Sequence, residues 1–257
     1  MEEYISYLDI AKQLELPKGA IVYLSSELIQ IALLAKKNKE RFDADNLIDS
    51  FLEVLGEKGT LCIPTFTFDF TNYGFYDYRK SKGTTGVLGN CALKHKGFQR
   101  TKHPVHSFAV AGYRREEYCS LENSNSFGSD SIFQRFYEQN AIQIILGTDY
   151  QRAMTFIHYV EMMEKVPYRY QKVFQGKYVD AQGIEKEKQI DYYVRNLQSN
   201  PIEKFNRIGK ILEDKKYSIR YLVNGGTDYK IDLHRSYEVI AKDIHENDCK
   251  NLYDFIL

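Results

Sequence analysis

Apolar residues follow two alternating patterns along the chain, continuous runs typical of buried strands and a three-to-four-residue spacing typical of helices. The continuous runs predict strands at residues 20–24, 60–64, 107–112 and 141–146. The helical spacing predicts helices at residues 4–16, 43–55, 86–95, 131–140 and 154–164. Because helices and strands alternate, we predict an α/β fold with a central mixed sheet flanked by helices.

The C-terminal third has a different character. Residues 168–195 alternate Tyr, Val and Lys around Gln182-Gly183, which predicts an antiparallel hairpin added to the α/β fold. A helix at 202–214, strands at 217–223 and 229–232, and helical segments to the end complete the prediction. The sequence contains no repeat and no low-complexity linker, so we expect one domain over residues 1–257.

Two segments are predicted to form the walls of a site. Residues 65–85 are rich in Phe, Tyr, Gly and Asn without a sustained period, which predicts a long functional loop. The strand at 142–146 ends at Gly147, and ligands of such sheets bind beyond the carboxyl ends of strands, which makes 147–155 a candidate site loop. Ser25 and Ser26 end the first strand, where a hydroxyl could instead cap the next helix.

Composition narrows the class of protein. The chain is 43% hydrophobic and 27% charged with a formal net charge of zero, as in ordinary globular proteins. A neutral protein has no overall attraction to nucleic acid or anionic membrane, so we expect neither as a partner. The first residues do not resemble a signal peptide and no apolar run approaches about 20 residues, so we expect a cytoplasmic protein.

The strongest local signal for chemistry is the pair His158 and Glu161 on the predicted helix at 154–164. Residues three apart share one face of a helix, so a carboxylate there can fix the tautomer of the imidazole and leave its other nitrogen as a base. A solvated surface pair remains the alternative. A metal site is not expected, because no second carboxylate–His pair appears and the four cysteines are widely spaced.

A second signal is the basic stretch 102–108, in which His103 and His106 surround a proline and precede Ser107. Pro104 fixes the local backbone, while the imidazoles and the hydroxyl offer hydrogen-bond donors to a phosphate or a carbonyl. A packed turn is the alternative interpretation. The stretch 59–68 ends a predicted strand in hydroxyls and aromatic rings, which suit either a ligand wall or the core.

In their order, these segments resemble the aminoglycoside 3-N-acetyltransferase family. That family has a strand ending in Ser-Ser, then GTLxxPTFT, TG before a helix, HPxHS, FGxxS before a strand ending in LG, a TxxHxxE helix and a VPYR-like segment. The corresponding residues are Ser25-Ser26, 59–67, Thr85-Gly86, 103–107, 127–131, Leu146-Gly147, 155–161 and 166–169. The ordered set spans nearly the whole chain and is far more specific than any single motif.

The resemblance implies acetyl-CoA as co-substrate and direct acetyl transfer to an amine without an acyl-enzyme. It implies that His158 and Glu161 form the catalytic pair and that the Thr155 hydroxyl lies near the thioester carbonyl. The positions that match the CoA-binding side of the family are Ser25, Ser26, Thr65, Phe66, His106 and Ser107.

The chain departs from the family at two places. A Gly-rich stretch usually follows the Ser pair, whereas this chain has the apolar and then basic residues 27–39, whose lysines could contact phosphate or simply be solvated. The loop before the catalytic Thr is acidic in the family, but here it holds Asp149 and Arg152, which we expect to contact the acceptor. Because Arg pairs with anionic oxygens, we hypothesise a nucleotide-linked amino sugar of bacterial surface glycan synthesis.

Three competing functions remain at this point. One is aminoglycoside 3-N-acetylation that gives antibiotic resistance. Another is a non-catalytic sugar- or CoA-binding protein that keeps the fold, and a third is a metal-dependent hydrolase using the HxxE pair. The expected partners are CoA and a small amine, with a homodimer left open.

Overall fold

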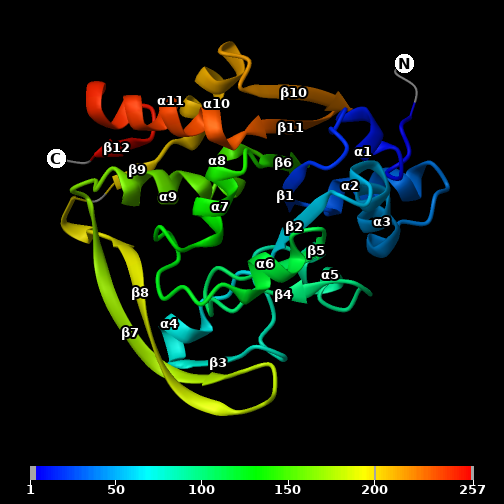
Figure 1. Cartoon of the computed structure of the whole chain (residues 1–257). Coiled ribbons are helices and arrows are strands. Elements are labelled where there is room, and N and C mark those ends of the chain that lie inside the picture. The colour runs from blue at the N-terminus through cyan, green and yellow to red at the C-terminus, as the bar shows by residue number, and fades with distance from the viewer. Residues whose placement is uncertain (1–3, 200, 256–257) are drawn as a thin grey trace.

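A computed structural model describes residues 4–199 and 201–255, and a seven-stranded sheet in the order β10-β11-β6-β1-β2-β5-β4 forms its centre (Figure 1). Strands β6, β1 and β2 are parallel, and the other neighbouring strands are antiparallel. The predicted mixed sheet flanked by helices is confirmed. The strands are β1 (Ile21–Ser26), β2 (Thr60–Pro64), β4 (Gln99–Arg100), β5 (Phe108–Gly112), β6 (Ile142–Leu146), β10 (Ser218–Val223) and β11 (Gly226–Asp232).

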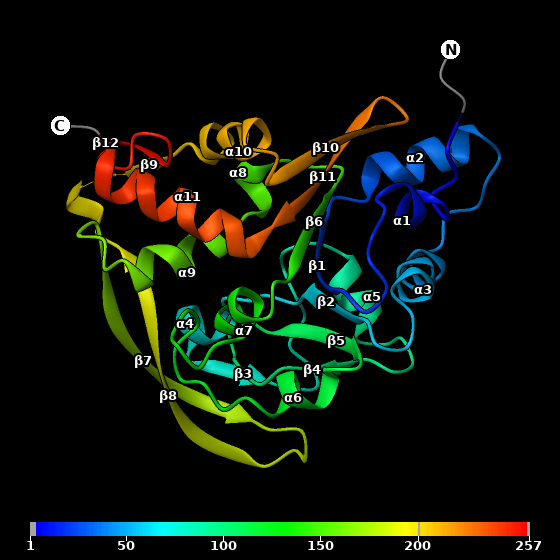
Figure 2. The ribbon, with the colours of Figure 1, turned by 45° about the horizontal axis from the view of Figure 1, so that its top comes forward.

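The continuous apolar run in β1 reflects burial on both faces of the sheet. Val22 and Leu24 pack into one apolar layer, while Tyr23 points into the other. Helices cover both faces, as Figure 2 shows. The first layer contains α1 (Ile10–Gln13), α2 (Ile29–Lys37), α3 (Ala44–Leu55) and α5 (Leu88–Ala92); the second contains α6 (Arg115–Ser120), α7 (Ile132–Glu138), α8 (Tyr150–Ala153), α9 (Phe156–Met163), α10 (Phe205–Asp214) and α11 (Leu233–Glu246).

The predicted hairpin is present as β7 (Arg169–Val179) and β8 (Glu185–Arg195). Its turn uses Gly183 at φ 88°, a backbone conformation that glycine adopts without a Cβ penalty. β3 (Phe75–Asp77) adds to its edge in parallel and completes a separate three-stranded sheet. In Figure 1 the hairpin extends away from the central sheet and passes beside α4 (Asp69–Tyr73).

Some predicted boundaries are wrong. The segment 65–85 is not a plain loop, because α4 and β3 form within it. The helix predicted at 4–16 is limited to α1, since the preceding residues are tied down by side chains: Tyr4 donates to Glu40 and Tyr7 to the carbonyl of Arg41. These contacts join segments more than 30 residues apart, which no local pattern reports.

The C-terminal end also differs from the prediction. The helix expected at 202–214 begins only at Phe205, because β9 (Pro201–Glu203) precedes it and pairs with β12 (Tyr253–Phe255). In this small sheet Tyr253 stands opposite Glu203. Over residues 4–199 and 201–255, no helix is both long and apolar enough to cross a membrane.

Candidate active site

A cavity of about 260 Å³ lies beyond the carboxyl ends of β1, β2 and β6. Ser26 of β1 pairs with Leu146 of β6, so the parallel strands end together and their following loops meet at this edge. This is the position at which sheets of this class bind ligands. The residues lining the cavity are Tyr23, Ser25, Ser26, Glu27, Pro64, Phe66, Thr85, Gly86, Thr148, Arg152, Ala153 and Thr155.

The Ser pair belongs to the cavity and not to a helix cap. Both residues lie in β1, and α2 begins after Leu28, whose side chain makes no capping hydrogen bond. The Ser25 hydroxyl accepts a hydrogen bond from Gln143 Nε2 at 3.2 Å, and the same amide donates to the Ala153 carbonyl at 2.8 Å. Gln143 therefore ties the Ser pair to the site loop, a role that no local pattern in the sequence indicates.

Helix α9 starts at this edge and carries the predicted catalytic pair. Thr155 precedes its first residue and lines the cavity, while His158 lies about one turn further along. His158 Nδ1 is 2.8 Å from Glu161 Oε2, with side chains that are 20% and 0% exposed. The contact assigns the ring proton to Nδ1 and leaves Nε2 as an acceptor. The expected pairing of these two side chains is present.

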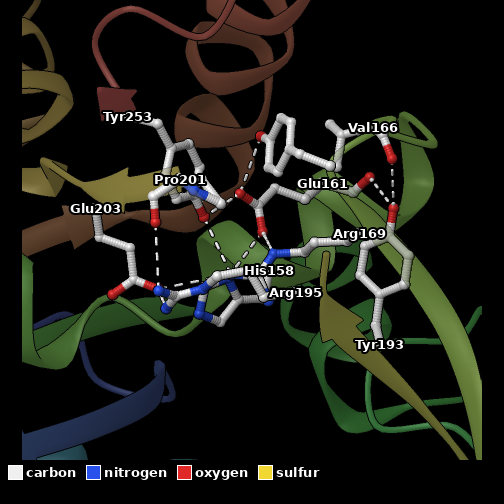
Figure 3. Close-up of polar contacts among 10 residues, drawn as sticks. His158, Glu161, Val166, Arg169, Tyr193, Arg195, Pro201, Glu203 and Tyr253 are labelled. Carbon is white, nitrogen blue, oxygen red and sulfur yellow. Dashed lines mark hydrogen bonds and ion pairs between the residues drawn. The ribbon is translucent and has the colours of Figure 1, made fainter. Parts of the chain in front are cut away.

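Glu161 is surrounded by polar partners from the C-terminal part of the chain (Figure 3). Arg169 Nε lies 2.8 Å from Oε2, and the hydroxyls of Tyr168 and Tyr253 donate to Oε1 at 3.1 and 2.5 Å. Burial by itself would raise the pKa of Glu161. Its interactions with His158, Arg169 and Tyr253 outweigh burial and hold the pKa below its usual value, so the carboxylate stays ionised.

The second histidine signal forms a buried, neutral cluster. Nδ1 of His103 accepts from the backbone amides of Val105 and His106, and the two imidazole rings stack with centroids 6.4 Å apart. Burial, with a smaller contribution from nearby Lys188, lowers the pKa of His103 to about 3. Burial and the neighbouring imidazoles also lower the pKa of His106 well below its usual value. Among residues 4–199 and 201–255, neither ring has a carboxylate partner that would make it a strong base.

The remaining residues assigned by resemblance to the CoA side divide into two groups. Phe66 lines the cavity and meets the ring of His106 edge-on at 4.7 Å. Thr65 and Ser107 are fully buried, and their hydroxyls share a hydrogen bond of 2.8 Å. Arg100 Nε donates to the Ser107 hydroxyl at 3.0 Å. Thr65 and Ser107 thus brace the cavity wall from behind and do not line it.

The loop residues expected to contact the acceptor, Asp149 and Arg152, differ in their surroundings. Asp149 caps α8, accepting from the Arg152 amide at 3.2 Å and from Asn206 Nδ2 at 2.9 Å. Arg152 lines the same cavity as Ser25 and Ser26. Arg152 therefore shares one cavity with Thr155 and with residues that the resemblance assigns to CoA.

Three side chains that contact Glu161 were not predicted as site residues from the sequence. Tyr253, 92 residues after Glu161, had no local signal, whereas Tyr168 and Arg169 stood in the VPYR-like segment. Within the described ranges, no three His, Cys, Asp or Glu side chains are grouped closely enough to hold a metal ion.

Three solved structures share this fold. Aminoglycoside acetyltransferase AAC(3)-Xa is 18% identical with a TM-score of 0.78, covering 94% of this chain and 93% of its own. Sisomicin-bound AAC-VIa is 15% identical with a TM-score of 0.75, covering 95% and 99%. AAC-IIIb in a binary complex with CoASH is 13% identical with a TM-score of 0.75, covering 95% and 98%. No curated protein sequence matches the chain.

The sequence model of one protein family, described as aminoglycoside 3-N-acetyltransferase, matches residues 34–242. The match contains Thr155, His158 and Glu161 and excludes Ser25, Ser26 and Tyr253. Since the match covers well over half of the 257 residues, the predicted resemblance and the expected acyltransferase class are both confirmed. The chain belongs to the aminoglycoside 3-N-acetyltransferase family of acyltransferases.

Proposed function

We propose that this protein transfers the acetyl group of acetyl-CoA to a primary amine of an aminoglycoside, with His158 as the general base. The observation that carries the proposal is the buried His158–Glu161 contact of 2.8 Å, one helical turn beyond the cavity-lining Thr155. A paired imidazole next to a cavity with hydroxyl groups is the arrangement that amine acylation requires.

The reaction balances with these groups. The amine nitrogen attacks the thioester carbonyl carbon, and His158 Nε2 takes the proton as the C–N bond forms. The C–S bond then breaks, and the thiolate of CoA receives the proton that His158 holds. The Thr155 hydroxyl is proposed as a donor to the oxyanion, and Glu161 stabilises the transient imidazolium.

Acetyl-CoA fits the cavity by the chemistry of its lining. Hydroxyls of Ser25, Ser26, Thr85 and Thr148 can hydrogen-bond to the amides of pantetheine, and the guanidinium of Arg152 can pair with phosphate oxygens. The arrangement is supported by the fold shared with AAC-IIIb, which binds CoASH. We therefore assign Arg152 to the donor side.

For the acceptor, the comparisons favour aminoglycosides over the nucleotide-linked amino sugar. The family description names an aminoglycoside amine, and the similar fold of AAC-VIa binds sisomicin. The alternative was based on an Arg facing the acceptor, whereas we assign Arg152 to the donor because it lines the same cavity as Ser25 and Ser26. We also propose that residues 1–257 form a single domain.

The test is thiol release from acetyl-CoA with sisomicin, with gentamicin and with nucleotide-linked amino sugars. We expect turnover of at least one aminoglycoside, lost in His158→Ala. Turnover of nucleotide-linked amino sugars alone would reinstate the discarded acceptor. Hydrolysis that needs added metal, or CoA binding without any transfer, would contradict the proposed reaction.

A further inference from the structure

The carboxylate of Glu161 is shared between the catalytic helix and residues that approach from the C-terminal part of the chain. His158 Nδ1 and Arg169 Nε both lie 2.8 Å from Oε2, while the Tyr253 hydroxyl donates to Oε1 at 2.5 Å (Figure 3). We propose that Arg169 and Tyr253 are positioning residues that set, through Glu161, the pH at which His158 becomes a free base. This inference rests on the proposed role of His158.

Arg169 acts as a fixed positive charge. Its side chain is 8% exposed, and the Nε–H is not directed at Glu161 Oε2 despite the short distance, so the contact is an ion pair without a hydrogen bond. Its Nη2 donates to the Tyr253 hydroxyl at 3.1 Å and lies 3.6 Å from Glu203 Oε1. Burial by itself would lower the pKa of Arg169. The Glu161 carboxylate and the other nearby groups outweigh burial and raise the pKa above its usual value, which keeps the guanidinium charged.

Tyr253 reaches the site through the small C-terminal sheet. It lies in β12, beyond the residues 34–242 matched by the family, and its pairing with Glu203 of β9 directs the ring toward α9. The side chain is buried, and its hydroxyl bridges Glu161 and Arg169. One of the two hydroxyl donors to Oε1 is thus supplied by a segment that the family match does not include.

The sign of the effect follows from treating His158 and Glu161 as one coupled pair. The pair carries one negative charge when His158 is the free base and none after it takes up a proton. A buried cation at 2.8 Å stabilises the negative form, so the pair becomes protonated only at a lower pH. Removing Arg169 should therefore let the pair take up its proton at a higher pH, and removing a hydroxyl donor to the same carboxylate should act in the same direction.

The other charged and titratable groups near this pair leave the sign unchanged. Glu203 is matched by Arg195 at 2.6 Å, and the two charges offset each other. The Tyr168 hydroxyl also donates to Glu161, and burial raises the pKa of the neighbouring Cys249 thiol to about 11, so both are neutral. His106 interacts electrostatically with His158, but it is neutral because burial holds its pKa well below the usual value.

The experiment is an NMR titration of the His158 ring, assigned from the signal lost in His158→Ala, in wild type and variants without any acceptor present. We expect Arg169→Gln to raise the titration midpoint by about one pH unit and Arg169→Lys to leave it near wild type. Tyr253→Phe should raise it by about half a unit. An unchanged or lower midpoint in Arg169→Gln would overturn the proposal.

Two matched controls separate this effect from general disruption. Tyr193→Phe removes a hydroxyl that donates to the main-chain oxygens of Glu161 and Val166, not to the carboxylate. Arg195→Gln removes a cation that contacts the carboxylate of Glu203 but not that of Glu161. Tyr193→Phe should leave the midpoint unchanged. Arg195→Gln removes one partner of Glu203, which also lies near Arg169, and should raise the midpoint by less than Arg169→Gln does. A shift in either control equal to that of its partner variant would contradict the assignment. If Arg169→Gln does not fold, Tyr253→Phe against Tyr193→Phe decides the question.

The same variants should shift the acid limb of kcat/KM in parallel, with KM for acetyl-CoA unchanged. Because the titration needs no substrate, failure to find an acetylated amine would defeat the proposed function and leave this inference testable. A normal activity profile with no effect of Arg169→Gln on the midpoint would defeat the inference and leave the proposed function standing.

Discussion

Helix α9 and the residue that follows it carry two glutamates about one turn apart, and each of them contacts a histidine and a tyrosine hydroxyl. Glu161 is fully buried and contacts His158, which is 20% exposed. Glu164 is 20% exposed and lies 2.6 Å from His245 Nε2, on an imidazole that is 57% exposed. The residue types match, but the surroundings differ.

The two glutamates differ in how deeply they are buried and in how many polar groups surround them. Glu161 is enclosed by Arg169 and two tyrosine hydroxyls, so its charge and orientation are fixed away from solvent. Glu164 receives one hydroxyl, from Tyr237 at 2.5 Å, and lies within reach of solvent, which screens the pair. We expect a His–Glu contact to serve as a catalytic base only where the surrounding structure holds it near a cavity, as at Glu161, and not where solvent reaches it, as at Glu164.

The largest effect is expected from removing the imidazole of His158. In His158→Ala the amine has no base, so kcat should fall about 10²- to 10⁴-fold, the range for general base catalysis. The cavity residues are untouched, so CoA binding measured by calorimetry should survive. Retention of most of the activity would show that the contact between His158 and Glu161 does not supply the base.

The two glutamates offer a direct test of what burial contributes. Glu161→Gln leaves the buried Arg169 with Glu203 at 3.6 Å in place of a carboxylate at 2.8 Å, which should cost about 3 kcal/mol of unfolding free energy. Glu164→Gln removes a partly exposed pair and should cost less than about 1 kcal/mol. Urea unfolding of both variants checks this, and equal losses would show that burial is not the distinguishing property.

Donor binding should be separable from proton transfer. Arg152→Ala removes the proposed phosphate partner at the cavity while leaving both clusters intact, so KM for acetyl-CoA should rise about tenfold with kcat little changed. Steady-state kinetics at saturating acceptor measures both constants. A raised KM for the acceptor instead would return Arg152 to the acceptor side, where the sequence first placed it.

The smallest effect is expected at the exposed histidine. His245→Ala removes only a screened ion pair, so activity should stay within about twofold and the unfolding free energy within about 1 kcal/mol of wild type. Activity assays and urea unfolding provide the measurements. A loss of activity close to that of His158→Ala would mean that His245 and Glu164 take part in the reaction.

Much of the site was predictable because its signals are local. The continuous apolar run at 60–64 predicted the buried strand β2, and the alternation around Gln182-Gly183 predicted the hairpin. His158 and Glu161 were predicted to meet because residues three apart on a helix must be neighbours. The order of short motifs identified the family, which the match over residues 34–242 confirmed.

What the tertiary structure alone decided concerns contacts between distant segments. The sequence could not show that Tyr253 reaches Glu161, that Thr65 bonds to Ser107 behind the cavity, or that Arg152 lines the same cavity as Ser25 and Ser26. These arrangements depend on strand order and on the pairing of β9 with β12, for which periodicity carries no information. The sequence determined which residues could form a base, and only the fold decided which His–Glu pair is buried and held to act as one.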